Sequence, residues 1–185
     1  MIEIVEYKRQ WPEEFQLLAD KVRQRVGASI LGLHHIGSTA VPGMDAKDVI
    51  DIQISVEDLS LDAEKGLELA GFERVPNLVD HCPFGMTLPD EQLSKRFYRG
   101  VTRAANVHVR QIGRVNHRYP LLCRDFLRHH KGAASAYAEM KRQLAKRFPN
   151  DVDSYYAIKD PAFDLIMSGA EEWAISSDWS IPDYD

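Results

Sequence analysis

Hydrophobic and polar positions alternate most regularly in residues 49–56, which read VIDIQISV. Successive side chains of a strand point to opposite faces, so a period of two predicts a β-strand with one apolar and one polar face. The apolar face carries three isoleucines and Val56, and the polar face carries Asp51 and Gln53. The pattern therefore places a carboxylate on a rigid element, where a functional group is held better than on a loop.

Helical spacing dominates the two ends of the chain. Apolar residues recur at this spacing from Trp11 to Val26, and Gly27 is a natural stop. The C-terminal half predicts a helix around residues 119–127, a second over 133–148, and one or two more over 151–173, around Pro161. Between these ends we predict strands over 31–36, 72–75, 96–100 and 106–112, a short helix over 61–70 and an irregular segment over 76–95, with a further short strand over 2–5 at the N-terminus.

Strands followed by helices predict an α+β fold, with a mixed β-sheet flanked by helices and a helical C-terminal half. The chain has 185 residues, a length typical of one domain with one core. We expect a single domain over residues 1–174. Residues 175–185 form a polar tail that we expect to be disordered or loosely docked.

Charge and composition exclude several classes of protein. The formal net charge is -5, so nucleic acid held by bulk positive charge is not an expected partner. There is no apolar signal segment at the N-terminus and no run of transmembrane length, which favours a cytoplasmic protein with no membrane contact. The two cysteines, Cys82 and Cys123, are far apart and indicate neither a zinc site nor a disulfide framework.

The segment before the regular strand has the composition of a phosphate site. Gly37-Ser38 reads as a turn whose backbone N–H groups and hydroxyl can meet a triphosphate, and Thr39 adds a second hydroxyl. Lys47 can neutralise phosphate charge, and the Asp51 carboxylate is a hard oxygen ligand of the kind that magnesium prefers. Each signal alone is weak, because Gly-Ser turns and solvent-facing aspartates are common, but their order along the chain is more specific.

These residues resemble the GrpB family, whose proteins have a nucleotidyltransferase-like fold. The resemblance is carried by HIGSTAVPG at residues 35–43, Lys47, IDI at 50–52, VHV at 107–109, RDFLR at 124–128 and YAEMKR at 137–142. It covers roughly residues 3–170. Family members are also found fused to dephospho-CoA kinase, which indicates nucleotide or coenzyme chemistry without naming a substrate.

The resemblance implies two acids one residue apart on the strand after the Gly-Ser turn, and a third on a neighbouring strand. In that superfamily the acids hold two magnesium ions while a hydroxyl attacks the α-phosphate of a nucleoside triphosphate. Asp51 matches the first acid, but the second position holds the neutral Gln53. The third falls on the polar face of Asn106, His108 and Arg110, which suits phosphate or carboxylate binding better than a second magnesium ion.

We therefore assign candidate roles along this face. Asp51, as the suspected magnesium ligand, and His108, as a base or a single metal ligand, are the candidate catalytic residues. The expected nucleotide- or phosphate-binding residues are His35, Gly37, Ser38, Thr39, Lys47, Gln53, Arg110 and Lys159. The resemblance implies a lysine at the position of Lys159, although a solvated lysine fits equally well. Arg124 and Lys141, on predicted helices, are further candidates to face the cleft.

Three hypotheses remain open on the sequence alone. The first is an enzyme that transfers a nucleotidyl group from a nucleoside triphosphate to a small-molecule acceptor with magnesium. The second is a non-catalytic nucleotide or anion sensor on the same fold, as the missing acids indicate. The third is a different reaction, such as ligation or phosphoryl transfer, in which His108 and Arg110 hold the acceptor. The nucleotide, the acceptor and the oligomeric state are not specified by the residues.

Overall fold

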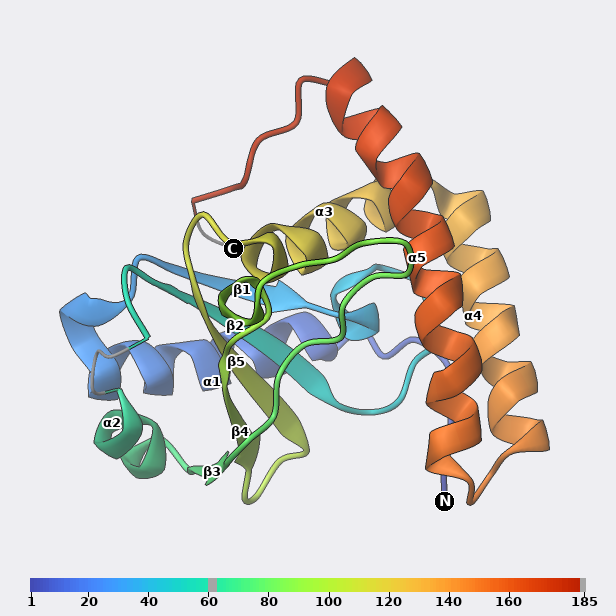
Figure 1. Cartoon of the computed structure of the whole chain (residues 1–185). Coiled ribbons are helices and arrows are strands. Elements are labelled where there is room, and N and C mark those ends of the chain that lie inside the picture. The colour runs from blue at the N-terminus through green and yellow to red at the C-terminus, as the bar shows by residue number, and fades with distance from the viewer. Residues whose placement is uncertain (60–62, 184–185) are drawn as a thin grey trace.

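The computed structural model describes residues 1–59 and 63–183 and has a central five-stranded sheet. The strands are β1 (Gly32–Ile36), β2 (Ile50–Val56), β3 (Phe72–Val75), β4 (Arg96–Gly100) and β5 (Ala105–Gln111), in the order β1-β2-β5-β4-β3. The β2–β5 pair is parallel and the other pairs are antiparallel. The mixed sheet and the α+β class predicted from the pattern are confirmed (Figure 1).

The helices lie on both faces of the sheet and beside it. They are α1 (Trp11–Val26), α2 (Glu64–Leu69), α3 (Val115–His129), α4 (Lys131–Arg147) and α5 (Val152–Ser176), and three short 3-10 turns, η1 (Gly27–Ser29), η2 (Ser38–Ala40) and η3 (Asp90–Gln92), join other elements. The last two helices run side by side at one edge of the molecule, with the N-terminus near the loop between them (Figure 1). The N-terminal segment is fixed there, because the Ile2 amide donates to the Pro149 carbonyl over 2.6 Å.

The apolar face of β2 forms the main core. Ile50, Ile52 and Ile54 are fully buried against α1, whose Trp11 and Phe15 are also inaccessible to solvent. Burial of such side chains is worth about 1.5–3 kcal/mol each, which explains why the alternation in β2 is so regular. A second apolar cluster joins α3, α4 and α5, and it packs against the loop before β2 through buried valine and methionine side chains.

Several element boundaries differ from the predictions. The expected strand over residues 2–5 is reduced to a single antiparallel bridge between Val5 and Ala46. The helix predicted from 119 begins at Val115, and α5 continues through Pro161 as one helix to Ser176. Part of the predicted helix over 61–70 lies outside the described residues. In the tail, Trp179 is docked: its indole Nε1 donates to Asp125 Oδ2 over 3.0 Å.

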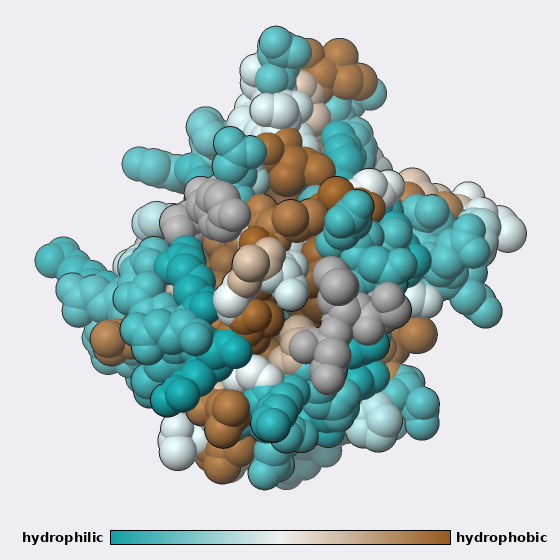
Figure 2. All heavy atoms as spheres, turned by 90° about the vertical axis from the view of Figure 1, so that its left-hand side faces the viewer, coloured by the Kyte–Doolittle hydropathy of each residue, from teal (hydrophilic) through white to brown (hydrophobic). Residues whose placement is uncertain are grey.

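The outer surface is largely polar. Figure 2 shows one face on which hydrophilic residues form most of the margin and hydrophobic residues gather toward the middle. Within residues 1–59 and 63–183, no helix combines the length and the apolar character that a membrane crossing requires.

The burial of the β2 isoleucines predicts how much stability is lost when one of their side chains is shortened. Ile52→Ala removes a fully buried side chain and should lower the free energy of unfolding by about 2–5 kcal/mol. Leu17→Ala is the matched control, because Leu17 lies on α1 with its side chain 65% exposed and should change stability by about 0.5 kcal/mol or less. Urea denaturation of the two variants measures both values, and equal losses would contradict this view of the core.

Candidate functional site

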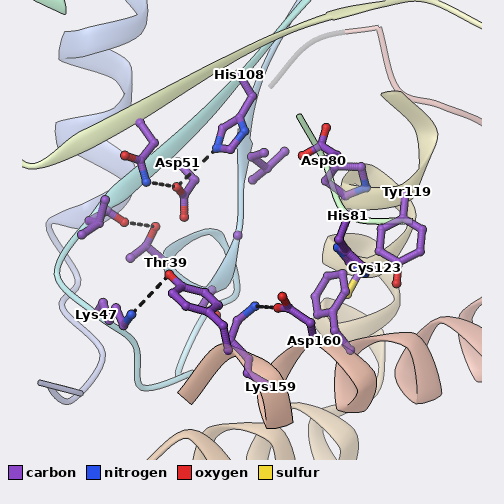
Figure 3. Close-up of a pocket in the computed structure, with 18 of the residues that line it drawn as sticks. Thr39, Lys47, Asp51, Asp80, His81, His108, Tyr119, Cys123, Lys159 and Asp160 are labelled. Atoms are coloured by element: carbon purple, nitrogen blue, oxygen red, sulfur yellow. Dashed lines mark hydrogen bonds and ion pairs between the residues drawn. The ribbon is translucent and has the colours of Figure 1, made fainter. Parts of the chain in front are cut away.

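A cavity of about 910 Å³ lies between the polar face of the sheet and the helices α3, α4 and α5. Figure 3 shows Asp51 and His108 on the sheet side, with Lys159 and Asp160 on the α5 helix across from them. The predicted site residues that line the cavity are Gly37, Ser38, Thr39, Lys47, Asp51, His108, Arg110 and Lys159. The sequence therefore identified residues that the fold brings together around one space.

The Gly-Ser turn is shaped by Asp51. Gly37 follows β1 with a φ of +71°, a conformation that favours glycine, and a Cβ added there would lie 2.5 Å from Asp51 Oδ2. The turn and the carboxylate are thus in direct contact, with Ser38 opening η2 beside them. Thr39 is almost fully buried and donates its hydroxyl to the Val49 carbonyl, so it fixes the turn on the strand.

Asp51 is held ionised by polar neighbours on β5. The Asn106 amide donates to Asp51 Oδ1 over 2.8 Å, and His108 Nε2 lies 3.8 Å from the same oxygen. Burial acts to raise the pKa of Asp51, but His108 and Asn106 overcome this effect and the pKa falls below its usual range. A carboxylate of this kind is a negative charge at neutral pH and a competent ligand for one cation.

His108 stays neutral because burial and the neighbouring cations disfavour its protonated form. Its Nδ1 lies 3.2 Å from Arg110 Nη2 and 3.4 Å from Lys95 Nζ, and both cations can only donate. This environment assigns the ring proton to Nε2, on the side of Asp51. Burial, reinforced by the charge of Arg110, lowers the pKa of His108 to about 4. The ring therefore orients Asp51, and its remaining nitrogen is occupied by cationic donors.

Arg110 occupies the region where the superfamily pattern calls for acids. Its side chain is 5% exposed, its Nε and Nη2 each donate to the Asp80 carboxylate over 2.9 Å, and its Nη1 donates to Gln53 Oε1 over 2.8 Å. Lys95 adds a 2.5 Å contact to Asp80 Oδ1. Asp80 and Gln53 thus hold a permanent cation next to His108. Burial acts to raise the pKa of Asp80, but Arg110 and Lys95 lower it far below its usual range.

Two predicted binding residues do not line the cavity. Gln53 is fully buried under α3, where its amide donates to the His117 carbonyl over 2.9 Å while its oxygen accepts from Arg110. His35 points to the other side of the sheet, stacks on Phe15 at 4.7 Å between ring centroids, and bonds Thr39 Oγ1 through Nε2 at 3.0 Å. The side chains of Gln53 and His35 are therefore packed inside the protein, whereas the prediction required them to contact a ligand.

Of the two helix candidates, only Lys141 faces the cavity. Arg124 is buried elsewhere and donates to the His35 carbonyl over 3.0 Å. Sequence reasoning missed Asp80 and Lys95, because both lie in the segment 76–95, which has no periodicity that would aim a side chain. One sequence signal pointed to the position of Asp80. The polar face of Asn106, His108 and Arg110 was predicted to bind an anion, and the Asp80 carboxylate binds Arg110 there.

A two-magnesium site does not fit these residues. Among residues 1–59 and 63–183 no group of three or more histidine, cysteine, aspartate or glutamate side chains is placed to hold a metal ion. Asp51 is a single acid, Gln53 is committed to Arg110, and two cations stand beside His108. One magnesium ion that keeps waters and phosphate oxygens in its shell fits better, since such ions are often held by one or two carboxylates.

The buried ion pair predicts a large effect at Asp80. Asp80→Asn leaves Arg110 and Lys95 without a counter-charge, and breaking a buried pair in this way costs about 3–5 kcal/mol of unfolding free energy. Asp90→Asn, an exposed change in the same segment, is the matched control and should cost about 0.5 kcal/mol or less. Thermal and urea unfolding measure the difference, and an Asp80 variant as stable as the control would show that the pair is dispensable.

Comparisons with known proteins agree with this architecture. The model of the GrpB protein family matches residues 1–168. A crystal structure of the conserved protein GrpB from Enterococcus faecalis superposes with a TM-score of 0.76 at 29% identity, over 92% of this chain and 99% of that one. A UPF0157 protein from Pseudomonas aeruginosa is 33% identical over 91% of this chain and 67% of its own length.

Other relatives are longer than this chain. A protein named dephospho-CoA kinase from Mycolicibacterium paratuberculosis is 32% identical over 92% of this chain, but the match covers only 46% of that protein. A UPF0157 protein from Bacillus subtilis is matched over 48% of its length. The chain thus spans about half the length of these two relatives, and the kinase name describes a protein with a large additional part. From the family match and the shared fold, the chain belongs to the GrpB family.

Proposed function

We propose that the cavity binds a nucleoside triphosphate. The observation that carries this proposal is the charge of the cavity wall in an acidic chain. Six lysine and arginine residues line the cavity against three aspartates, whereas the whole chain has a net charge of -5. The cations are Lys47, Lys95, Arg99, Arg110, Lys141 and Lys159, and the acids are Asp51, Asp80 and Asp160. A positive, partly desolvated wall of this size favours a polyanionic ligand.

Asp51 is the residue that we propose for the metal. A magnesium ion arriving with the triphosphate would neutralise phosphate charge, with Asp51 as its protein ligand. The Gly37-Ser38 turn is in contact with this carboxylate and would receive the adjoining phosphate. Asn106 and His108 keep Asp51 in place for that contact, which is a positioning role.

The reaction that this arrangement favours is transfer of the nucleotidyl group to a small-molecule acceptor. An acceptor hydroxyl or amine would attack the α-phosphorus, and the pyrophosphate would leave with the electrons of the broken P–O bond and take up the proton that the acceptor loses. The cationic wall supports such a step because charge on the leaving phosphates grows as that bond breaks. The volume of about 910 Å³ lies at the upper end of the usual range for small-molecule sites, which accommodates a nucleotide together with a small acceptor.

A second candidate function is binding without turnover. It is favoured by one specific observation, the bond between Arg110 and Gln53, which places a cation and a neutral amide where the transferase pattern has acids. In this case the protein would act as a nucleotide or anion sensor. The two candidates share the ligand and differ in whether a product is formed.

Titration calorimetry with each nucleoside triphosphate tests whether the cavity binds a nucleotide, which both candidate functions require. Wild-type protein should bind one of them more tightly with magnesium than without it. Asp51→Asn should lose the gain due to magnesium and retain the binding seen without metal, because the cationic wall is unchanged. Asp90→Asn is the matched surface control and should behave like the wild type. Equal magnesium dependence in the wild type and Asp51→Asn would remove the metal role from Asp51.

Product analysis separates the two candidates. The bound triphosphate is incubated with magnesium and pools of small metabolites, and release of pyrophosphate is followed. Pyrophosphate formed by the wild type and lost in Asp51→Asn would support transfer. Tight binding with no pyrophosphate across the acceptor pools would favour the sensor, and absence of nucleotide binding would reject both the transferase and a nucleotide sensor.

A further inference from the structure

Three lysines form a cluster on the helical side of the cavity, across from the sheet. Lys47 lies before β2, Lys141 on α4 and Lys159 on α5, and all three line the cavity together with Ser38. Their partners are mostly neutral or aromatic. The ammonium of Lys47 lies 3.4 Å from the Tyr156 hydroxyl, and it stands over the rings of two tyrosines of α5 at 4.4 and 4.8 Å from the ring centroids.

Lys141 is the most buried member, with 3% of the residue exposed. Its ammonium donates to Ser38 Oγ over 2.7 Å and to the Asp45 carbonyl over 2.9 Å, and it lies 4.9 Å from the centroid of the Tyr137 ring. Each of these partners is uncharged. A buried ammonium satisfied only by neutral groups keeps much of its desolvation cost, and an anion at the cavity surface would offset that cost.

Nearby acids do not neutralise the cluster. The Asp45 carboxylate is engaged by Arg142 and by the Tyr7 amide, and Asp160 lies 3.0 Å from Lys159 alone. Asp160 thus pairs with one of the three ammonium groups, while the charges of Asp51 and Asp45 act on Lys47 and Lys141. The ammonium groups of the cluster repel one another. Burial lowers the pKa of Lys47 most, and the charge of Lys159 lowers it further.

We propose that Ser38, Lys47, Lys141 and Lys159 form a seat for the terminal phosphates of the ligand, here called the lysine seat. The proposal rests on the proposed function for the identity of the whole ligand. It adds a direction: the phosphate chain runs from Asp51 toward α4 and α5. Inorganic pyrophosphate, which has the same terminal phosphates without a nucleoside, should occupy the lysine seat by itself.

Phosphate fits the lysine seat better than other anions for two reasons. Lysine ammonium groups bind phosphate as point charges, and three of them match the several oxygens of a terminal phosphate chain. The aromatic side chains around Lys47 and Lys141 limit solvent access, which strengthens these contacts. The Asp51 carboxylate, which lies against the Gly37-Ser38 turn, repels terminal phosphates unless a cation lies between them.

The lysine seat couples anion binding to proton uptake. Burial, followed by the charge of Lys159, lowers the pKa of Lys141 to about 7. The other ionisable groups around it are Asp45 from the loop before β2, Tyr137 and Arg142 from its own helix and the buried thiol of Cys123 from α3. An anion favours the protonated amine, so the pKa of Lys141 rises on binding. Affinity should therefore fall as the pH increases through about 7.

Calorimetry with inorganic pyrophosphate, without magnesium, tests the lysine seat. Wild type should bind, and Lys141→Met and Lys47→Met should each weaken binding about tenfold or more. Lys146→Met is the matched control, because Lys146 lies on the exposed side of α4, and it should bind like the wild type. At about pH 8, titrations in two buffers of different ionisation enthalpy should show more proton uptake by the wild type than by Lys141→Met.

Each outcome bears on the lysine seat separately from the nucleotide. Pyrophosphate binding that is equal in the wild type, Lys47→Met and Lys141→Met would overturn the lysine seat, even if nucleoside triphosphates bind. Malonate that binds as tightly as pyrophosphate would overturn its assignment to phosphate. Pyrophosphate binding that depends on both lysines, with no nucleoside triphosphate binding, would keep the lysine seat and reject the proposed function. Lys47 is only partly buried, so its variant tests the lysine seat even if Lys141→Met fails to fold.

Discussion

The buried guanidinium of Arg110 organises the polar face of the sheet. It is held by Asp80 from the segment 76–95 and by Gln53 from β2, and it directs a nitrogen at the His108 ring. A buried arginine needs this number of partners, because an uncompensated charge in the interior is costly. The same contacts pin the irregular segment over the cavity, reinforce the burial that keeps His108 neutral, and direct the ring proton of His108 to the side of Asp51.

This network changes the chemistry that the fold can support. In the two-metal arrangement, acids on neighbouring strands gather positive ions at the site. Here Asp51 is the acid that the described strands present to the cavity, next to a fixed cation, and the neutral Gln53 accepts a hydrogen bond from that cation beneath α3. The positive charge of the site is thus largely built into the protein. The three lysines of the lysine seat extend this positive charge to the side of the cavity formed by α4 and α5.

Local patterns in the sequence predicted much of the fold and most of the strand and turn residues that line the cavity. The period of two in residues 49–56 placed Asp51 toward the cavity, and the turn at Gly37-Ser38 lies against it as the sequence order indicated. The burial of Gln53 could not be predicted in this way, because it depends on α3, a helix that begins 62 residues later in the chain. Likewise His35 alternates to the α1 face, and only the register of β1 on β2 reveals which of two adjacent histidines does so.

The central claim is that a polyanion lies along the cavity with one metal ion at Asp51 and its terminal phosphates on the lysine seat. The most direct measurement is a crystal structure with a non-hydrolysable nucleoside triphosphate analogue and manganese, located by anomalous scattering. We expect one ion on Asp51, terminal phosphates bonded to Lys47, Lys141 and Lys159, and an intact hydrogen bond between Arg110 and Gln53. Two ions with Gln53 as a ligand, or terminal phosphates at the opposite end of the cavity, would contradict this claim.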